Sequence, residues 1–256
     1  MTVTALTVAY DGAPFAGFAR QSEQRTVQGT LEDALRTVLR REVETVGAGR
    51  TDAGVHALGQ VVSFESAPGD PDAAALARSL NALCAPHVAV REVRAAREGF
   101  SARFDAEARE YRYRIAAGAV PPVLLAPYAW HVARDLDAPA VRRAAAALVG
   151  EHDFRSFCVA DSAEGKNTVR TLTAVELYPA EDLGEPHLVL RVVGTAFLHS
   201  MVRVIAGSLV EIGRGARDEG WLGEALAARD RAAAGPTAPA HGLTLWDVAY
   251  PGECWV

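Results

Sequence analysis

At residues 47–57 of the 256-residue chain, small residues surround one arginine, one aspartate and one histidine. Residues 47–57 read GAGRTDAGVHA, and glycines let another group come close to the backbone. Arg50 and Asp52 are two positions apart, so an extended backbone places both side chains on one side. A guanidinium keeps a neighbouring carboxylate ionised, as a nucleophile or a base requires. The pattern predicts an accessible reactive carboxylate, although a tight turn with an ordinary surface ion pair fits the same residues.

Phosphate binding fits this loop poorly, because neither GxGxxG nor GxxxxGK[ST] can be written through it. The nine residues GRTDAGVHA, 49–57, instead resemble the signature of the TruA family of tRNA pseudouridine synthases. In that family the aspartate of the signature is the catalytic nucleophile, which here is Asp52. The resemblance implies an enzyme that isomerises uridine to pseudouridine at positions 38, 39 and 40 in the anticodon stem-loop of tRNA. Shorter segments resemble family segments in the same order: YDG at 10–12, TVQ at 26–28, LN at 80–81, DFRSF at 153–157 and AHGL at 240–243.

Two further segments, FSARF at 100–104 and REYRY at 109–113, resemble the family's FxAR and YxY segments. The first tyrosine of the family pair faces the target uracil, which implies this role for Tyr111. Arg103 lies in the FxAR match and is a candidate for substrate binding. By its pattern alone, Tyr111 is on the apolar side of a strand, and a core tyrosine with a hydrogen-bonded hydroxyl fits equally well.

The segment AFLHSMVR, residues 196–203, resembles the family's AFLxxMVR, which brings an arginine into a salt bridge with the catalytic aspartate. The resemblance therefore implies that Arg203 pairs with Asp52, whereas local pattern alone fits a solvated helix arginine. Leu243 or Leu245 is the candidate for packing against the base, and an interior strand leucine would look the same. Arg50 is expected to help extrude the base or to hold a flanking phosphate. His56 is expected to be a neutral histidine hydrogen-bonded to loop backbone.

One departure from the family pattern occurs at residues 17–21. They read GFARQ where the family usually has GWQxQ. The RNA contacts of that family loop are therefore not assigned to Phe18 and Ala19.

The elements around the loop follow from hydrophobic periodicity. Alternation predicts strands at 2–10, 60–64 and 88–93, with a short one entering the loop at 45–46, and helical spacing predicts helices at 26–40 and 72–83. Thr26 is placed to cap the first helix. This strand–helix–strand–strand–helix–strand order is typical of a ferredoxin-like arrangement, with helices on one face of an antiparallel sheet.

The rest of the chain repeats the mixture. Strands are expected at 109–115, 170–177, 188–193 and 243–250, and helices at 137–148, 199–212 and 219–228. On the helix at 199–212, Met201, Ile205 and Leu209 belong to a core stripe, while His199 and Arg203 fall on another face. We expect an α+β pseudouridine synthase fold with ferredoxin-like halves at 1–104 and 105–256. Their antiparallel sheets are expected to meet around a central cleft that holds the site.

Composition limits the class of protein. Half of the residues are apolar and 23% are charged, as in soluble globular proteins. The chain has no run of 18 apolar residues, so no membrane span is expected. It has no basic amino-terminal region, so no signal peptide is expected. The three cysteines form no CxxC and the seven histidines are scattered. We therefore expect a cytoplasmic protein with no metal. The isomerisation that the family resemblance implies involves no redox change, so no cofactor is expected either.

The partner expected from the resemblance is tRNA, bound by a homodimer. A formal net charge of −6 argues against indiscriminate nucleic-acid binding but leaves room for a local basic cleft. Two alternatives stay open: a non-catalytic RNA-binding module on a ferredoxin-like sheet, and a small-molecule glycosidase or hydrolase. The first lacks an RNP1-like aromatic run, and the second lacks the second carboxylate that most glycosidases use.

Overall fold

The computed structural model describes residues 2–160 and 164–256, and these form two compact units. Unit 1 comprises Met1–Arg109 and Leu245–Val256, and unit 2 comprises Glu110–Thr244. The closing strand, β10 (Leu243–Ala249), was expected in the second half of the chain. Its residues from Leu245 onward belong instead to unit 1, where β10 lies next to β3 (His56–Glu65).

Unit 1 contains the strand and helix order expected from the sequence. Its elements are β1 (Val3–Tyr10), α1 (Val27–Leu39), β2 (Val46–Gly47), β3 (His56–Glu65), α2 (Ala73–Cys84), β4 (Val88–Ala96) and most of β10 (Leu243–Ala249). The strands follow the order β4-β1-β3-β10, with β2 paired to β3. The β1–β3, β1–β4 and β2–β3 pairs are antiparallel.

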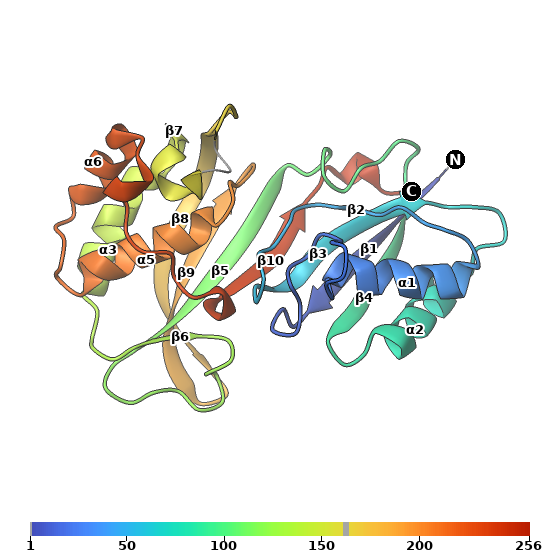
Figure 1. Cartoon of the computed structure of the whole chain (residues 1–256), viewed down its shortest axis with the longest axis horizontal. Helices are drawn as coiled ribbons and strands as arrows, with labels where there is room; N and C mark the ends of the chain where they lie inside the picture. Colours follow the sequence, from blue (N-terminus) through green and yellow to red (C-terminus); the bar gives the residue numbers. More distant parts are fainter. Residues whose placement is uncertain (1, 161–163) are drawn as a thin grey trace. The chain divides into compact units, whose positions relative to one another are not determined.

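Both helices of unit 1 begin at the side chains that the sequence indicated. The Thr26 hydroxyl accepts a 3.2 Å hydrogen bond from the amide of Gly29, and the Asp72 carboxylate accepts a 2.7 Å bond from the amide of Ala75. Such caps satisfy amide groups that have no partner within the helix. The helices α1 and α2 pack beside each other along one face of the sheet (Figure 1). They bury a leucine-rich stripe there: Leu31, Leu35, Leu76 and Leu80.

Unit 2 combines a second group of strands with three α-helices. Its elements are β5 (Ala108–Ala117, from Glu110 onward), β6 (Trp130–Val132), α3 (Ala138–Ala145), β7 (Gly150–Asp153), β8 (Val169–Asp182), β9 (Glu185–Gly194), α5 (Met201–Gly213) and α6 (Trp221–Ala228). The strand order is β5-β9-β8-β7, and β6 runs parallel to β5 at the edge. The helices gather beside β8 and β9 (Figure 1). Short 3₁₀ turns complete the chain at Ala146–Leu148, Arg155–Phe157, Arg231–Ala233, Ala240–Gly242 and Gly252–Cys254.

The helix α5 is the most deeply buried element of unit 2. Arg203 and Glu211 are its two residues outside the buried set. A Cβ on Gly207 would lie 1.9 Å from the carbonyl oxygen of Pro236, so this helix comes close to another backbone segment at a position where only glycine fits.

Some boundaries differ from the sequence prediction. The helix predicted at 199–212 begins at Met201, because Ser200 has a left-handed backbone with φ of 58°. Placing His199 with Arg203 on one helix face was therefore wrong. The strands β8 and β9 also extend further, to a two-residue turn at Leu183 and Gly184 with φ of 54° and 77°.

The predicted α+β class is confirmed, but two strands were missed. These are β6 and β7, which have three and four residues and are too short for an alternating pattern to stand out. Within residues 2–160 and 164–256, no helix combines the length and the apolar character that crossing a bilayer requires.

Candidate functional site

The signature loop runs from the end of β2 to the start of β3, and its backbone is fixed on both sides of Asp52. The Thr51 hydroxyl lies 2.8 Å from the Tyr10 hydroxyl, and the Thr51 carbonyl accepts a 3.1 Å hydrogen bond from the amide of Phe18. On the other side, the Asp52 carbonyl accepts a 3.1 Å bond from the amide of Val55, which closes a turn. Asp52 itself is half-buried and Arg50 is exposed. The loop therefore fixes the backbone at Asp52 and leaves the residue partly exposed.

Two glycines of the preceding segment allow that segment to lie against the signature. A Cβ on Gly12 would lie 2.0 Å from the Val55 carbonyl oxygen, and one on Gly17 would lie 3.0 Å from the Thr51 carbonyl oxygen. Gly17 also has φ of 112°, a conformation that favours glycine. The YDG segment, 10–12, is thus a structural support for the signature loop.

His56 is buried and supports the loop from the other strand. Its Nδ1 accepts a 3.1 Å hydrogen bond from the amide of Gly12 and lies 3.2 Å from a carboxylate oxygen of Asp11. The predicted hydrogen bond between His56 and loop backbone is confirmed, and the neutral state of the ring stays a prediction.

The departure at residues 17–21 places a buried aromatic side chain next to the signature loop. Phe18 is 2% exposed, and its ring lies 6.3 Å from the ring of Tyr10 between their centroids. A Cβ on Gly47 would lie 2.4 Å from the same ring. The Phe18 side chain therefore fills the space beneath the signature loop.

Tyr111 contacts the segment that carries Arg203. Its ring makes an edge contact with Phe197, with 4.9 Å between centroids and 74° between ring planes. Tyr111 lies on β5, whereas Phe197 lies in the AFLHSMVR segment that leads into α5. Two motifs that the sequence separates by more than eighty residues thus meet within unit 2.

Arg203 is oriented by a backbone group that the sequence did not indicate. Its Nε donates a 2.9 Å hydrogen bond to the carbonyl oxygen of Ala238, and the Ala238 amide donates a 3.1 Å bond to the Arg203 carbonyl. The next residue, Pro239, accepts a 2.8 Å bond from the Tyr113 hydroxyl. Burial raises the pKa of the Tyr113 hydroxyl, partly offset by the charge of Arg203. The segment 235–242 therefore links α5 to β5.

The remaining candidates occupy both units. Arg50, Asp52, Arg103 and Leu245 belong to unit 1, and Tyr111, Arg203 and Leu243 belong to unit 2. Leu243 and Leu245 are both buried on β10, and Arg103 is exposed. The pairing of Asp52 with Arg203 would join the two units and stays a prediction.

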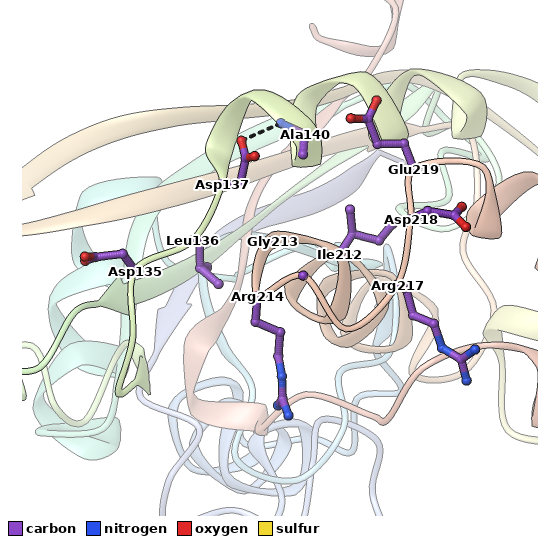
Figure 2. Close-up of a pocket in the computed structure, with 11 residues that line it drawn as sticks. Asp135, Leu136, Asp137, Ala140, Ile212, Gly213, Arg214, Arg217, Asp218 and Glu219 are labelled. Carbon is purple, nitrogen blue, oxygen red and sulfur yellow. Dashed lines mark hydrogen bonds between the residues drawn. The ribbon is translucent and has the colours of Figure 1, made fainter.

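A hollow of about 640 Å³ lies elsewhere, in unit 2 (Figure 2). It is lined by the residues that lead into α3 and those at the end of α5, and Figure 2 shows the Asp137 carboxylate holding the amide of Ala140. None of the seven candidate residues lines it. In the part of the chain that the structure describes, no group of three or more His, Cys, Asp or Glu could hold a metal ion.

Comparison with known proteins agrees with the geometry of the loop. A family model described as tRNA pseudouridine synthase matches residues 6–105 and 144–251. The tRNA pseudouridine synthase A of Bacillus licheniformis is 45% identical over 95% of this chain and 97% of its own. The protein of the same name from Ralstonia nicotianae is 46% identical over 98% of this chain and 91% of its own.

Solved structures give a weaker likeness. An H/ACA RNP bound to a substrate RNA containing 2'-deoxyuridine aligns at 12% identity and a TM-score of 0.38, over 82% of this chain and 43% of that one. That score is too low to decide the fold. The family model matches most of the chain and the near relatives match almost all of it, so this chain belongs to the tRNA pseudouridine synthase family.

Proposed function

We propose that the chain isomerises uridine to pseudouridine in the anticodon stem-loop of tRNA, at positions 38, 39 and 40, with Asp52 as the nucleophile. The observation that carries the proposal is the GRTDAGVHA loop, whose backbone is held on both sides of a half-buried, accessible carboxylate. The relatives that match nearly the full chain are named tRNA pseudouridine synthase A.

The reaction needs little more than a positioned carboxylate. The C1′–N1 bond of uridine breaks and a C1′–C5 bond forms, while N1 gains a proton and C5 loses one, so no electrons are gained or lost overall. Asp52 would form a covalent bond to the target nucleotide, which divides one difficult step into easier ones. Water must stay out, because it would hydrolyse the intermediate.

Arg203 and Tyr111 supply the other functions. A guanidinium beside Asp52 would keep its carboxylate charged, and the Nε bond to Ala238 supports this by fixing the orientation of the Arg203 side chain. The Tyr111 ring would lie against the detached uracil, since proteins hold unstacked bases on aromatic faces. Its edge contact with Phe197 supports a fixed ring. Leu243 or Leu245 would pack against the base, and Arg50 would hold a flanking phosphate or help extrude the base.

We also propose two ferredoxin-like halves around a central cleft. The order β1-α1-β2-β3-α2-β4 recurs as β5-α3-β8-β9-α5-β10 when the short β6 and β7 are set aside. The pairings agree: β3 lies between β1 and β2, and β9 lies between β5 and β8. This repetition supports a shared architecture for both halves.

The proposed partner is one tRNA bound by a homodimer in the cytoplasm. Two copies would offer separate local basic strips to one large RNA, which is compatible with a net charge of −6. The buried free thiols of Cys84, Cys158 and Cys254 suit a reducing compartment. Sedimentation should give twice the 27.1 kDa of one chain. A mass of one chain at all concentrations would contradict the dimer.

Tritium release tests the activity. The protein is incubated with tRNA labelled with tritium at uracil C5, because pseudouridine formation exchanges that hydrogen. Asp52→Asn should bind tRNA and release no tritium, whereas Glu44→Gln, an exposed carboxylate before β2, should release it like wild type. A binding module would release none in any variant, and a glycosidase would free uracil without a pseudouridine product. Full release by Asp52→Asn would remove Asp52 from its role.

A further inference from the structure

The most exposed aromatic side chain of unit 1 lies on a turn that the proposed mechanism does not use. Phe104 is 80% exposed, and the guanidinium carbon of Arg103 lies 5.4 Å from the centroid of its ring. Burial of an aromatic side chain contributes strongly to stability, and Phe104 leaves almost all of its surface in water. Unstacked bases stack on aromatic rings and on arginine guanidinium groups, and here one of each faces solvent.

The turn that carries these residues is rigidly built. The amide of Ala102 donates a 3.0 Å hydrogen bond to the Ser63 hydroxyl, and its carbonyl accepts a 2.6 Å bond from the Tyr250 hydroxyl. The Asp105 carboxylate accepts a 2.7 Å bond from the amide of Ser101 and pairs with Arg97 at 2.6 Å. Phe104 is therefore displayed by a fixed support, so its exposure is not a consequence of a loose loop.

One arginine ties this turn to the signature loop. Arg109 Nη2 donates to the carbonyl oxygen of Arg103 at 2.7 Å and to that of Ala48 at 3.0 Å. Ala48 precedes Asp52 by four residues, which span at most about 14 Å of chain. Successive stacked bases are about 3.4 Å apart along a strand. A base on Phe104 would therefore be within a few nucleotides of one at Asp52.

We propose that Arg103 and Phe104 form a stacking platform for an unpaired base that neighbours the target uridine in the RNA. This inference rests on the proposed function, since it takes Asp52 as the point where the target lies. The platform recognises a π face and a phosphate charge, with no hydrogen bond to base edges, so it accepts any base. It would hold the RNA strand in register beside Asp52 while the target nucleotide is extruded.

The test measures binding by the full chain in the Asp52→Asn background, so that turnover does not alter the RNA. An anticodon stem-loop RNA carries 2-aminopurine at one unpaired position next to the target, in a series of positions, because stacking quenches its fluorescence. At one position the protein should quench it, and Phe104→Tyr should do the same. Phe104→Ala should abolish the quenching and weaken Kd about 5- to 100-fold, the range that stacking of one base on an aromatic ring gives.

Two matched variants sharpen the result. Leu83→Ala removes another exposed apolar side chain of unit 1, at the end of α2, and should leave both readouts unchanged. Phe104→Leu keeps an apolar side chain without a π face and should behave like Phe104→Ala. Since Phe104 is exposed, all variants should melt like their parent.

Three results would overturn the platform: unchanged Kd and quenching in Phe104→Ala, wild-type behaviour of Phe104→Leu, or loss of RNA binding only because Phe104→Ala separates two copies of the chain in sedimentation. The binding measurements need no turnover, so they decide the role of Phe104 even if the wild-type protein releases no tritium. If the wild type releases tritium and Phe104→Ala changes neither Kd nor quenching, the proposed function stands and only this inference is overturned.

Discussion

Arg203 and Ala238 are joined by a reciprocal pair of hydrogen bonds: Nε of the arginine donates to the alanine carbonyl at 2.9 Å, and the alanine amide donates to the arginine carbonyl at 3.1 Å. A residue with no functional side chain thereby sets the direction of a guanidinium. A lysine cannot reproduce this arrangement, because it has neither the Nε donor nor the planar fork.

Arg203→Lys is therefore expected to keep the charge and lose most of the activity. The lost hydrogen bond to a charged donor is worth about 1.5–3 kcal/mol, or about 10- to 100-fold in kcat/KM for tritium release. The control is Arg214→Lys, since Arg214 is a half-exposed partner of Glu211 at the end of α5. Equal activity of Arg203→Lys and wild type would show that the Ala238 bond has no role in catalysis.

Phe197→Ala is expected to lower activity through Tyr111. The edge contact of the two rings contributes about 0.5–1.5 kcal/mol beyond the area it buries, so the rate should fall up to about tenfold as the Tyr111 ring becomes free to turn. Phe197→Tyr keeps the ring and should restore the rate, measured as kcat with saturating tRNA. An unchanged rate in Phe197→Ala would show that the contact with Phe197 is not needed to position the Tyr111 ring.

Gly12→Ala is expected to displace the signature loop. The new methyl group would lie 2.0 Å from the Val55 carbonyl oxygen, and overpacking of this kind costs about 1–3 kcal/mol. The melting temperature and the tritium release should both fall. Gly252→Ala, which meets no atom within 4 Å, is the control and should change neither. If Gly12→Ala is fully active and stable, the signature loop accommodates the methyl group and the prediction is wrong.

Glu110 should make stability depend on acid. Burial raises the pKa of its carboxyl group, but hydrogen bonds from Arg191 and Arg112 outweigh this and leave the pKa below its usual value. A carboxylate with a lowered folded pKa stabilises the protein above its unfolded pKa, near 4.3, and loses that contribution as pH falls through the folded value. Glu110→Gln should thus unfold about 2 kcal/mol more easily at pH 7.

Urea titrations at pH 7 and pH 3 measure this difference. The gap between Glu110→Gln and wild type should narrow as the pH falls, because the wild-type carboxylate becomes protonated. Glu151→Gln, an exposed carboxylate on β7, should show no gap at either pH. A gap of equal size at both pH values would rule out the ion pairs as its origin.

The sequence predicted those features of the fold that depend on neighbouring residues. Thr26 caps α1 as expected, and the second helix begins at Asp72, where it was predicted to begin, because a cap needs only a hydroxyl or carboxylate three residues from an amide. The start of α5 was missed, because the left-handed backbone of Ser200 has no pattern in its residue type. Short strands such as β6 also escape detection by periodicity.

The candidate site residues were also identified from local sequence, and their roles stay predictions. The signature indicated Asp52 and Arg50, and the family segments indicated Tyr111 and Arg203. No local pattern could indicate that Ala238 orients Arg203, that Phe18 fills the space beneath the loop, or that Phe104 lies exposed on a fixed turn. Each of these depends on residues that are distant in the chain, and only the folded structure brings them together.

The segment 235–242 reads GPTAPAHG and has the composition of a spacer. Yet the carbonyl of Pro236 lies against Gly207, and the carbonyls of Ala238 and Pro239 accept hydrogen bonds from Arg203 Nε and the Tyr113 hydroxyl. A library of random variants screened for lost RNA modification should consequently return many hits in this run of prolines and alanines. Shortening the segment by even one residue would misalign all three backbone groups, so we expect a deletion here to lower activity although the segment reads as a spacer.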